Sequence, residues 1–201
     1  MKGSVTMLDN LKKYKIILAS NSPRRRKLLS GLGIDFEVKV LNDIDETYPA
    51  GCLTPEDVPL YISKKKAEAN RESMEADELL ITADTVVIVD DEVLGKPVDK
   101  ADAVRMLRLL SGRRHHVVTG VCLTTRGEQR SFSVTTGVTF KTLTDEEIDY
   151  YIRQYKPFDK AGAYGIQEWI GYIGVTGLDG SYFNVMGLPV QRIYVELQHF
   201  D

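Results

Sequence analysis

The sequence feature that most constrains the fold is a pair of long runs rich in β-branched residues, His116 to Thr124 and Ser131 to Thr142. A short polar stretch containing Gly127 separates them, and this arrangement predicts a β-hairpin. Hairpin strands are antiparallel, whereas a strand, a helix and a second strand in succession are typical of a crossover connection. The rest of the chain has the second pattern, so we expect both kinds of strand in one mixed sheet.

The crossover pattern begins near the N-terminus. Residues 15–19 and 36–40 are predicted as short strands, and a helix from Pro23 to about Leu32 is expected between them. Ser22 is a good N-cap for this helix, and Pro23 suits its first position. Further helices are expected over residues 55–74, over residues 99–112, from the capping box at residues 144–147 and from Pro189.

The central stretch of the chain predicts two strands with an acidic residue between them. Residues 79–82 and 86–89 are both apolar, and the tripeptide Ala83-Asp84-Thr85 divides them. The pair Asp90-Asp91 predicts a turn, after which residues 92–94 return as a strand. Together these elements predict an α/β fold with a mixed, elongated central sheet flanked by helices, which is compatible with two lobes around a cleft.

The composition fits one folded unit and narrows the class of partner. The chain has 201 residues, 43% of them hydrophobic, which is enough to bury a sizeable core. We expect a single domain over residues 1–201, with residues 1–13 as a flexible lead-in. Proteins that bind long nucleic acids through the phosphates usually carry an excess of basic residues, whereas this chain has a net charge of −3. Any anion that it binds is therefore expected to be small.

The sequence also bears on the cellular compartment. No stretch is apolar over the ~18 residues that a membrane span needs, and the first residues lack the apolar run of a signal peptide. We therefore expect a cytoplasmic protein with no membrane partner. Cys52 and Cys122 are far apart and match no metal-binding or redox spacing, which favours free thiols in a reducing compartment.

Three consecutive arginines, Arg24, Arg25 and Arg26, are expected in the first turn of the first helix. The N-terminus of a helix carries a partial positive charge, so cations there cost about 0.3–1 kcal/mol each. An anion bound at this point would offset the cost, because the arginines, the backbone N–H groups and the hydroxyls of Ser20 and Ser22 would all donate to it. The alternative is a solvated basic surface.

Asp84 is an acidic residue between two apolar runs, where a solvent-facing carboxylate is not expected. Burying a carboxylate is costly unless it is paired, binds a metal or takes part in chemistry. With the hydroxyl of Thr85 beside it, Asp84 could activate water or hold a divalent cation that does so; the alternative is an aspartate at a strand end in a turn. Lys96 is a further cation, in a loop between a glycine and a proline. His115 and His116 would point to opposite faces of a strand, and we interpret both as structural.

Several ordered motifs resemble the Maf family of nucleotide pyrophosphatases, and the match spans about residues 15 to 195. A set of motifs in the expected order is far more specific than any one of them. They are Ser20-Asn21-Ser22-Pro23-Arg24-Arg25, Ala83-Asp84-Thr85-Val86-Val87, Leu94-Gly95-Lys96-Pro97, residues 110–115 with 118–121, residues 159–167 and residues 180–189.

The resemblance implies an elongated α/β fold related to that of inosine triphosphate pyrophosphatases, with a cleft between two lobes. It also implies hydrolysis of a nucleoside triphosphate to the monophosphate and pyrophosphate with a divalent metal, Mg²⁺ or Mn²⁺. Asp84 matches the catalytic base of the family, and we expect Asp84 and Glu46 to hold the metal. The residues expected to bind substrate are Ser20, Ser22, Arg24, Arg25, Glu46, Lys66, Thr85, Lys96 and Gln167.

One branch of the family acts on dTTP and UTP, and another acts on 7-methyl-GTP. Residues 161–167 and 180–182 resemble the pyrimidine branch, and the other branch tends to have a glutamate where Gln167 stands. An amide offers a donor and an acceptor, which suits the imide edge of uracil or thymine, whereas a carboxylate only accepts. We therefore expect hydrolysis of dTTP and UTP, with modified pyrimidine nucleotides left open.

Two other functions fit parts of the sequence. A non-catalytic, nucleotide-binding regulator of septum formation with the same fold would keep the arginines but would not need Asp84. A binder of single-stranded nucleic acid could stack bases on Tyr150, Tyr151 and Tyr155, but these lie in a predicted helix far along a negatively charged chain. We therefore expect a small nucleotide as the partner and no nucleic acid. A homodimer is expected as well, because dimers are common among small enzymes.

Overall fold

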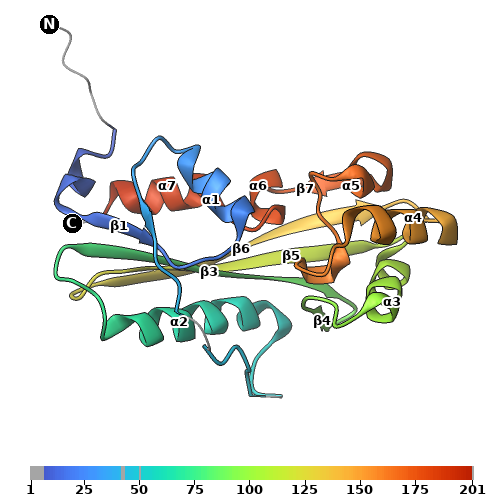
Figure 1. Ribbon diagram of the computed structural model, residues 1–201, viewed down its shortest axis with the longest axis horizontal. Coiled ribbons are helices and arrows are strands. Elements are labelled where there is room, and N and C mark those ends of the chain that lie inside the picture. Colours follow the sequence, from blue (N-terminus) through green and yellow to red (C-terminus); the bar gives the residue numbers. More distant parts are fainter. Residues whose placement is uncertain (1–6, 42–43, 50, 201) are drawn as a thin grey trace, which may run out of the picture.

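A computed structural model of the protein describes residues 7–41, 44–49 and 51–200. The strands in these ranges are β1 (Lys15–Leu18), β2 (Glu37–Val38), β3 (Glu78–Val89), β4 (Glu92–Leu94), β5 (Arg114–Thr124), β6 (Gln129–Phe140) and β7 (Val175–Asp179). They form one sheet in the order β2-β1-β3-β5-β6-β7, with β4 paired to β3 (Figure 1). β1 pairs in parallel with β2 and β3, whereas all other pairs are antiparallel. The predicted mixed sheet and its β5–β6 hairpin are therefore confirmed.

Helices cover both faces of this sheet. They are α1 (Pro23–Ser30), α2 (Val58–Arg71), α3 (Lys100–Leu110), α4 (Asp145–Tyr155), α5 (Trp169–Gly174), α6 (Tyr182–Val185) and α7 (Val190–Gln198), with 3-10 helices at Asp9–Lys13, Pro55–Asp57 and Ala161–Ala163. α2 lies on one face of the sheet, and α1 and α7 lie on the other (Figure 1). Ser22 and Asp99 cap their helices as predicted, and Thr144 and Glu147 form the predicted capping box.

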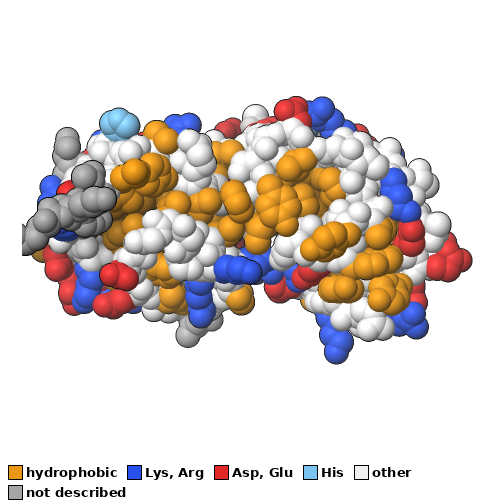
Figure 2. Space-filling model, turned by 90° about the horizontal axis from the view of Figure 1, so that it is seen from above, with side chains coloured by type: hydrophobic (Ala, Val, Ile, Leu, Met, Phe, Trp, Pro, Cys, Tyr) orange, Lys and Arg blue, Asp and Glu red, His pale blue; other side chains and the backbone are white. Residues whose placement is uncertain are grey.

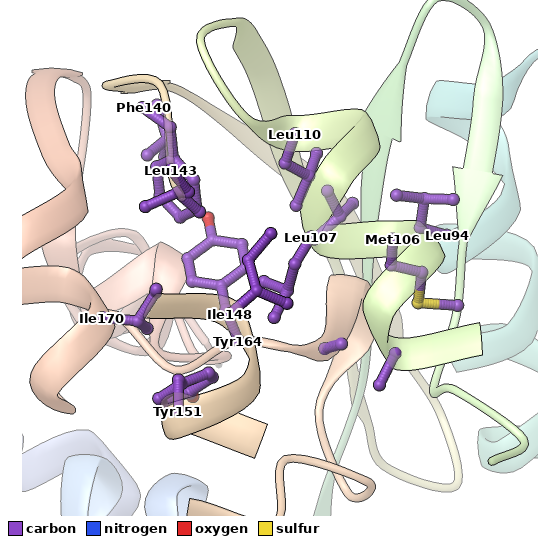
Figure 3. Close-up of a cluster of buried hydrophobic side chains, with 14 of the residues drawn as sticks. Leu94, Met106, Leu107, Leu110, Phe140, Leu143, Ile148, Tyr151, Tyr164 and Ile170 are labelled. Carbon is purple, nitrogen blue, oxygen red and sulfur yellow. The ribbon is translucent and has the colours of Figure 1, made fainter. Parts of the chain in front are cut away.

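Two main hydrophobic cores lie along the sheet, one toward each end. The first lies between α1, α7 and the sheet and includes Leu29 and Ile193. The second joins α3, α4 and α5 and includes the fully buried side chains of Tyr151 and Phe140 (Figure 3). β3 contributes residues to both cores, so the two lobes expected from the sequence are the two ends of one continuous sheet.

The prediction of two strands divided at Asp84 is wrong, because β3 is continuous. β5 pairs with β3 from Leu80 to Ile88 without interruption, and Asp84 lies opposite Gly120. Only the other edge of β3 is interrupted. There β1 pairs as far as Ile81 and β4 pairs only from Val87, so within the described residues 82–86 have no strand partner on that side. We call these five residues the open edge of β3.

Part of the expected flexible lead-in is folded. Residues 9–13 form a 3-10 helix in which Leu11 is buried, and the side chain of Asn10 donates hydrogen bonds to the carbonyl oxygens of Leu197 and Phe200. These contacts hold the segment against the end of the chain. The first six residues of the expected lead-in lie outside the described residues. No helix in the described ranges combines the length and the apolar character that crossing a bilayer requires.

The approach of α2 to the sheet depends on Gly120. A Cβ atom added at Gly120 would lie 2.3 Å from the backbone nitrogen of Leu60 in α2. We predict that Gly120→Ala lowers the free energy of unfolding by about 1–3 kcal/mol, since the helix must move away from the sheet. Gly127→Ala is the matched control, because a Cβ there meets nothing within 4 Å. Urea denaturation compares the two, and equal stability of both variants would contradict the close approach.

Candidate active site

All the side chains that the sequence predicts as site residues line one cleft over the open edge of β3. The cleft has a volume of about 970 Å³. Its walls come from the start of α1, the segment before α2, α2 itself, the loop after β4 and the segment between α4 and α5. The predicted residues that line it are Ser20, Ser22, Arg24, Arg25, Glu46, Lys66, Asp84, Thr85, Lys96 and Gln167.

Asp84 and Lys66 form an ion pair at the centre of the cleft. The ammonium nitrogen of Lys66 lies 2.8 Å from Oδ1 of Asp84 and 3.1 Å from Oε1 of Glu46. The side chains of Lys66 and Asp84 are only 13% and 14% exposed. Charges removed from water to this degree are costly unless paired, and the ammonium of Lys66 pairs with both carboxylates. The arrangement brings two acidic oxygens to one point beside the open edge.

Two converging carboxylates fit a divalent cation that also binds phosphate. Mg²⁺ is usually held by one or two carboxylates, with substrate phosphates and water completing its octahedron. Asp84 and Glu46 meet this description because both reach the same ammonium nitrogen. Among the described residues there is no group of three or more acids, histidines or cysteines that could form a complete metal cage. These two residues are therefore suited to a metal site that the substrate completes.

The start of α1 lies beside this centre. The backbone N–H of Ser22 donates to the hydroxyl of Ser20, and the hydroxyl of Ser22 caps the helix by accepting from the backbone N–H of Arg25. Arg24 extends across the cleft, where its Nη1 lies 2.7 Å from Oδ2 of Asp159. Arg26 is exposed and does not line the cleft, in agreement with its position outside the sequence motif. The three arginines therefore have three different environments.

Arg25 connects three segments of the protein. Its guanidinium donates to the carbonyl oxygen of Ala83 at 2.8 Å, to that of Gly187 at 2.7 Å and to the hydroxyl of Thr85 at 3.0 Å. Burial lowers the pKa of Arg25, although Asp84 nearby favours the charged form. The carbonyl of Ala83 belongs to the open edge, so Arg25 supplies the hydrogen bond that a neighbouring strand would otherwise provide. Most of its donors are thus committed to the protein itself.

Two groups on residues that line the cleft, the amide oxygen of Gln167 and the ammonium of Lys96, have no partner among the described residues. Oε1 of Gln167 is buried and accepts no hydrogen bond there. Buried polar atoms are nearly always paired, so an orphaned amide oxygen on a residue that lines a cleft is consistent with recognition of a ligand. Lys96 is exposed, and none of the described residues pairs with it. Thr85 is connected to the core by a hydrogen bond between its hydroxyl and that of Thr119.

Sequence reasoning missed Asp159 and Lys160, which also line the cleft. They lie in one of the recognised motifs, but an acid next to a base gave no sign that Asp159 would contact Arg24, which is 135 residues away. His115 is buried and His116 is exposed, as their predicted placement on opposite faces of a strand requires. Nε2 of His115 pairs with the hydroxyl of Tyr164, and burial lowers the pKa of His115 to about 3. Cys52 and Cys122 are free thiols, as expected.

The comparison with known families covers almost the whole fold. Residues 15–200 match the family model described as Maf-like protein. The chain belongs to the Maf family. Similar proteins named dTTP/UTP pyrophosphatase occur in Phocaeicola vulgatus, 67% identical over 192 residues that cover 96% of this chain and 99% of the relative, and in Porphyromonas gingivalis, 63% identical over 196 residues that cover 96% and 98%. A protein of the same name in Flavobacterium johnsoniae is 46% identical over 186 residues, or 92% and 95% of the two chains. The family resemblance inferred from the motifs is thus confirmed.

The role of Arg25 can be tested by removing its donors. We predict that Arg25→Met lowers the free energy of unfolding of this Maf protein by about 2–4 kcal/mol, because buried carbonyl groups at Ala83 and Gly187 lose their hydrogen bonds. Arg26→Met is the control. Arg26 is exposed, and its hydrogen bond to the carbonyl of Asn21 joins residues of the same segment rather than distant ones. Chemical denaturation measures both. If Arg25→Met were as stable as Arg26→Met, the connecting role of Arg25 would be refuted.

Proposed function

We propose that this Maf protein hydrolyses dTTP and UTP to the nucleoside monophosphate and pyrophosphate. The observation that carries the proposal is the central group of the cleft, in which Lys66 holds Asp84 and Glu46 together beside the open edge of β3. Cations at Arg24 and Lys96 and an unpaired amide oxygen at Gln167 lie around the same cleft. The names of the relatives support the same activity.

Asp84 is the proposed general base. It accepts a proton from a water molecule whose oxygen forms a bond with the α-phosphorus, and the bond from that phosphorus to the oxygen bridging to the β-phosphate breaks. The proton resides on Asp84, and the electron pair leaves with pyrophosphate. Positioning and neutralisation of charge account for most of the catalysis in phosphoryl-type transfers. In this cleft Lys66, Arg24, Arg25 and Lys96 are the cations proposed to neutralise the leaving group, although most donors of Arg25 bind the protein itself.

Asp84 and Glu46 are the residues that would hold a divalent cation, Mg²⁺ or Mn²⁺. Such a cation, when bound, lowers the pKa of water and neutralises phosphate charge. The ammonium of Lys66 contacts both carboxylates in the protein alone and so reduces the repulsion between them. The chain thereby keeps a pair of acidic oxygens available to a cation that arrives with the triphosphate.

Gln167 is the proposed reader of the base. Its amide can donate to a carbonyl oxygen of the pyrimidine and accept from the ring N–H between the carbonyls, and its Oε1 is the atom that the protein leaves unpaired. A carboxylate at this position would only accept. Thr85 follows Asp84 directly and accepts a hydrogen bond from Arg25 of α1, so it lies beside the proposed base.

The proposal also covers the cellular compartment and the oligomeric state of the enzyme. We place it in the cytoplasm, acting on free nucleotides rather than on long nucleic acid. Hydrophobic side chains gather on the face of the molecule seen in Figure 2. The segments α5, β7 and α6 contribute exposed hydrophobic side chains, namely Tyr172, Leu178, Tyr182 and Phe183. A face of this kind supports the proposal of a homodimer. Light scattering of the purified protein determines the oligomeric state directly.

Asp84→Asn tests the proposed base. We predict that kcat for UTP falls by at least about 100-fold, the range associated with loss of a general base, while the fold is retained. Asp91→Asn is the control, because Asp91 is exposed in the turn after β3 and does not line the cleft. Release of pyrophosphate and circular dichroism are measured for both. Near-normal turnover by Asp84→Asn would exclude Asp84 as the base, whereas a regulator that only binds nucleotide would show no turnover even in the unaltered protein.

Gln167→Glu tests the reading of the base. We predict that kcat/KM for dTTP and UTP falls by about tenfold or more, since the amide donor is lost and a charge is placed beside the pyrimidine. Inhibition by pyrophosphate, which has no base, is expected to change little. Gln191→Glu on the exposed face of α7 is the matched control. If Gln167→Glu and Gln191→Glu gave the same kcat/KM for dTTP and UTP, Gln167 would not contact the base.

A further inference from the structure

A line of alternating charges connects the cleft with the core between α4 and α5. Arg24 donates to Asp159, and the other carboxylate oxygen of Asp159 accepts from Lys160 at 2.7 Å. Lys160 also lies 3.1 Å from Oε1 of Glu168, whose second oxygen accepts from the hydroxyl of Tyr151. We call these five residues the ionic chain. None of its members after Arg24 has a part in the reaction described above.

Arg24 makes two hydrogen bonds to Asp159, one to its side chain and one to its backbone. Its Nη1 donates to the carboxylate of Asp159 at 2.7 Å, and its Nη2 lies 3.3 Å from the backbone carbonyl oxygen of the same residue. A guanidinium has five N–H groups, so donors remain for a ligand in the cleft. Two contacts from different nitrogens fix the plane of the guanidinium. A fixed plane matters because arginine binds phosphate through two parallel hydrogen bonds.

The ionic chain is anchored progressively deeper in the protein. The side chain of Asp159 is 58% exposed, that of Lys160 is 9% exposed, and Tyr151 is fully buried in the core shown in Figure 3. Burial raises the pKa of Asp159, but the hydrogen bonds from Lys160 and Arg24 outweigh this and bring it down to about 2. Asp159 is therefore ionised at neutral pH. Because Lys160 holds the carboxylate of Asp159, that carboxylate can hold the guanidinium of Arg24 in place.

The same chain reaches the base side of the cleft. Gln167 precedes Glu168 in sequence, and the backbone N–H of Gly165 donates to the hydroxyl of Tyr151. The segment that bears Gln167 is thus tied to the same anchor as Arg24. We propose that Asp159 is a positioning residue that orients Arg24 toward the triphosphate and, through Lys160 and Glu168, sets its place relative to Gln167. This inference deepens the proposed function and rests on it.

A double-mutant cycle between Arg24 and Asp159 tests the inference. Asp159→Glu keeps the charge but moves the carboxylate by one methylene, and Arg24→Lys keeps the charge but removes the two-point contact. The binding of inorganic pyrophosphate is measured by calorimetry, and KM and kcat are measured with UTP. Asp149→Glu is the control. Asp149, on α4, forms an ion pair with Lys100 of α3 and does not line the cleft.

The expected result is that Asp159→Glu weakens pyrophosphate binding about three- to tenfold and raises KM by a similar factor, with a smaller change in kcat. In the Arg24→Lys background the same substitution is expected to change binding less than about twofold, because the group that Asp159 orients is gone. Asp149→Glu should behave as the unaltered protein. This pattern would not arise from a general loss of stability, which acts in both backgrounds alike.

Two results would overturn the inference. Equal effects of Asp159→Glu in both backgrounds would mean that Asp159 does not act through Arg24. Tighter pyrophosphate binding in Asp159→Glu would mean that Asp159 competes with the ligand for Arg24 instead of orienting it. Failure of the proposed function has a different signature, since the unaltered protein would then release no pyrophosphate from dTTP or UTP.

Discussion

The interruption of one edge of β3 is the constraint on which the rest of the structure depends. β5 pairs with β3 along most of its length, but β1 ends at Ile81 and β4 begins at Val87 on the opposite side. A continuous neighbour there would fill the space of the cleft. The strand must still satisfy its backbone groups, and Arg25 donates to the carbonyl of Ala83 for this reason. The cleft therefore exists because a side chain replaces part of a strand.

This constraint also explains why charged groups can gather at the centre of the sheet. Lys66 reaches Asp84 from α2, which approaches β5 closely because position 120 has no side chain. The ion pair between Lys66 and Asp84 offsets part of the cost of removing these two charges from water. The hydrophobic cores on either side keep the sheet rigid. A rigid sheet with an open edge can hold reacting groups in fixed positions, as transition-state stabilisation requires.

The sequence was sufficient for much of the fold and for the membership of the site. Long strands and capped helices such as α4 have clear periodic and capping signals, and every predicted site residue lines the cleft. The short helices α5 and α6 gave no usable signal, because helices of six and four residues span fewer than two turns and show no repeating apolar pattern. The sequence predicts a break at Ala83-Asp84-Thr85 because two polar residues interrupt an apolar run. The pairing of β3 with β5, which keeps the strand continuous, cannot be seen in the sequence. Contacts between distant segments, such as Arg24 with Asp159, depend on tertiary packing that a single sequence does not encode locally.

The central claim is that this cleft directs a water molecule to the α-phosphorus of a pyrimidine nucleoside triphosphate. Hydrolysis of UTP in water enriched in heavy oxygen, followed by mass spectrometry of the products, tests it most directly. The account predicts that the heavy oxygen appears in UMP and that pyrophosphate is unlabelled, because the bond formed is the one to the α-phosphorus. Label in pyrophosphate, or release of single phosphates instead of pyrophosphate, would contradict the account.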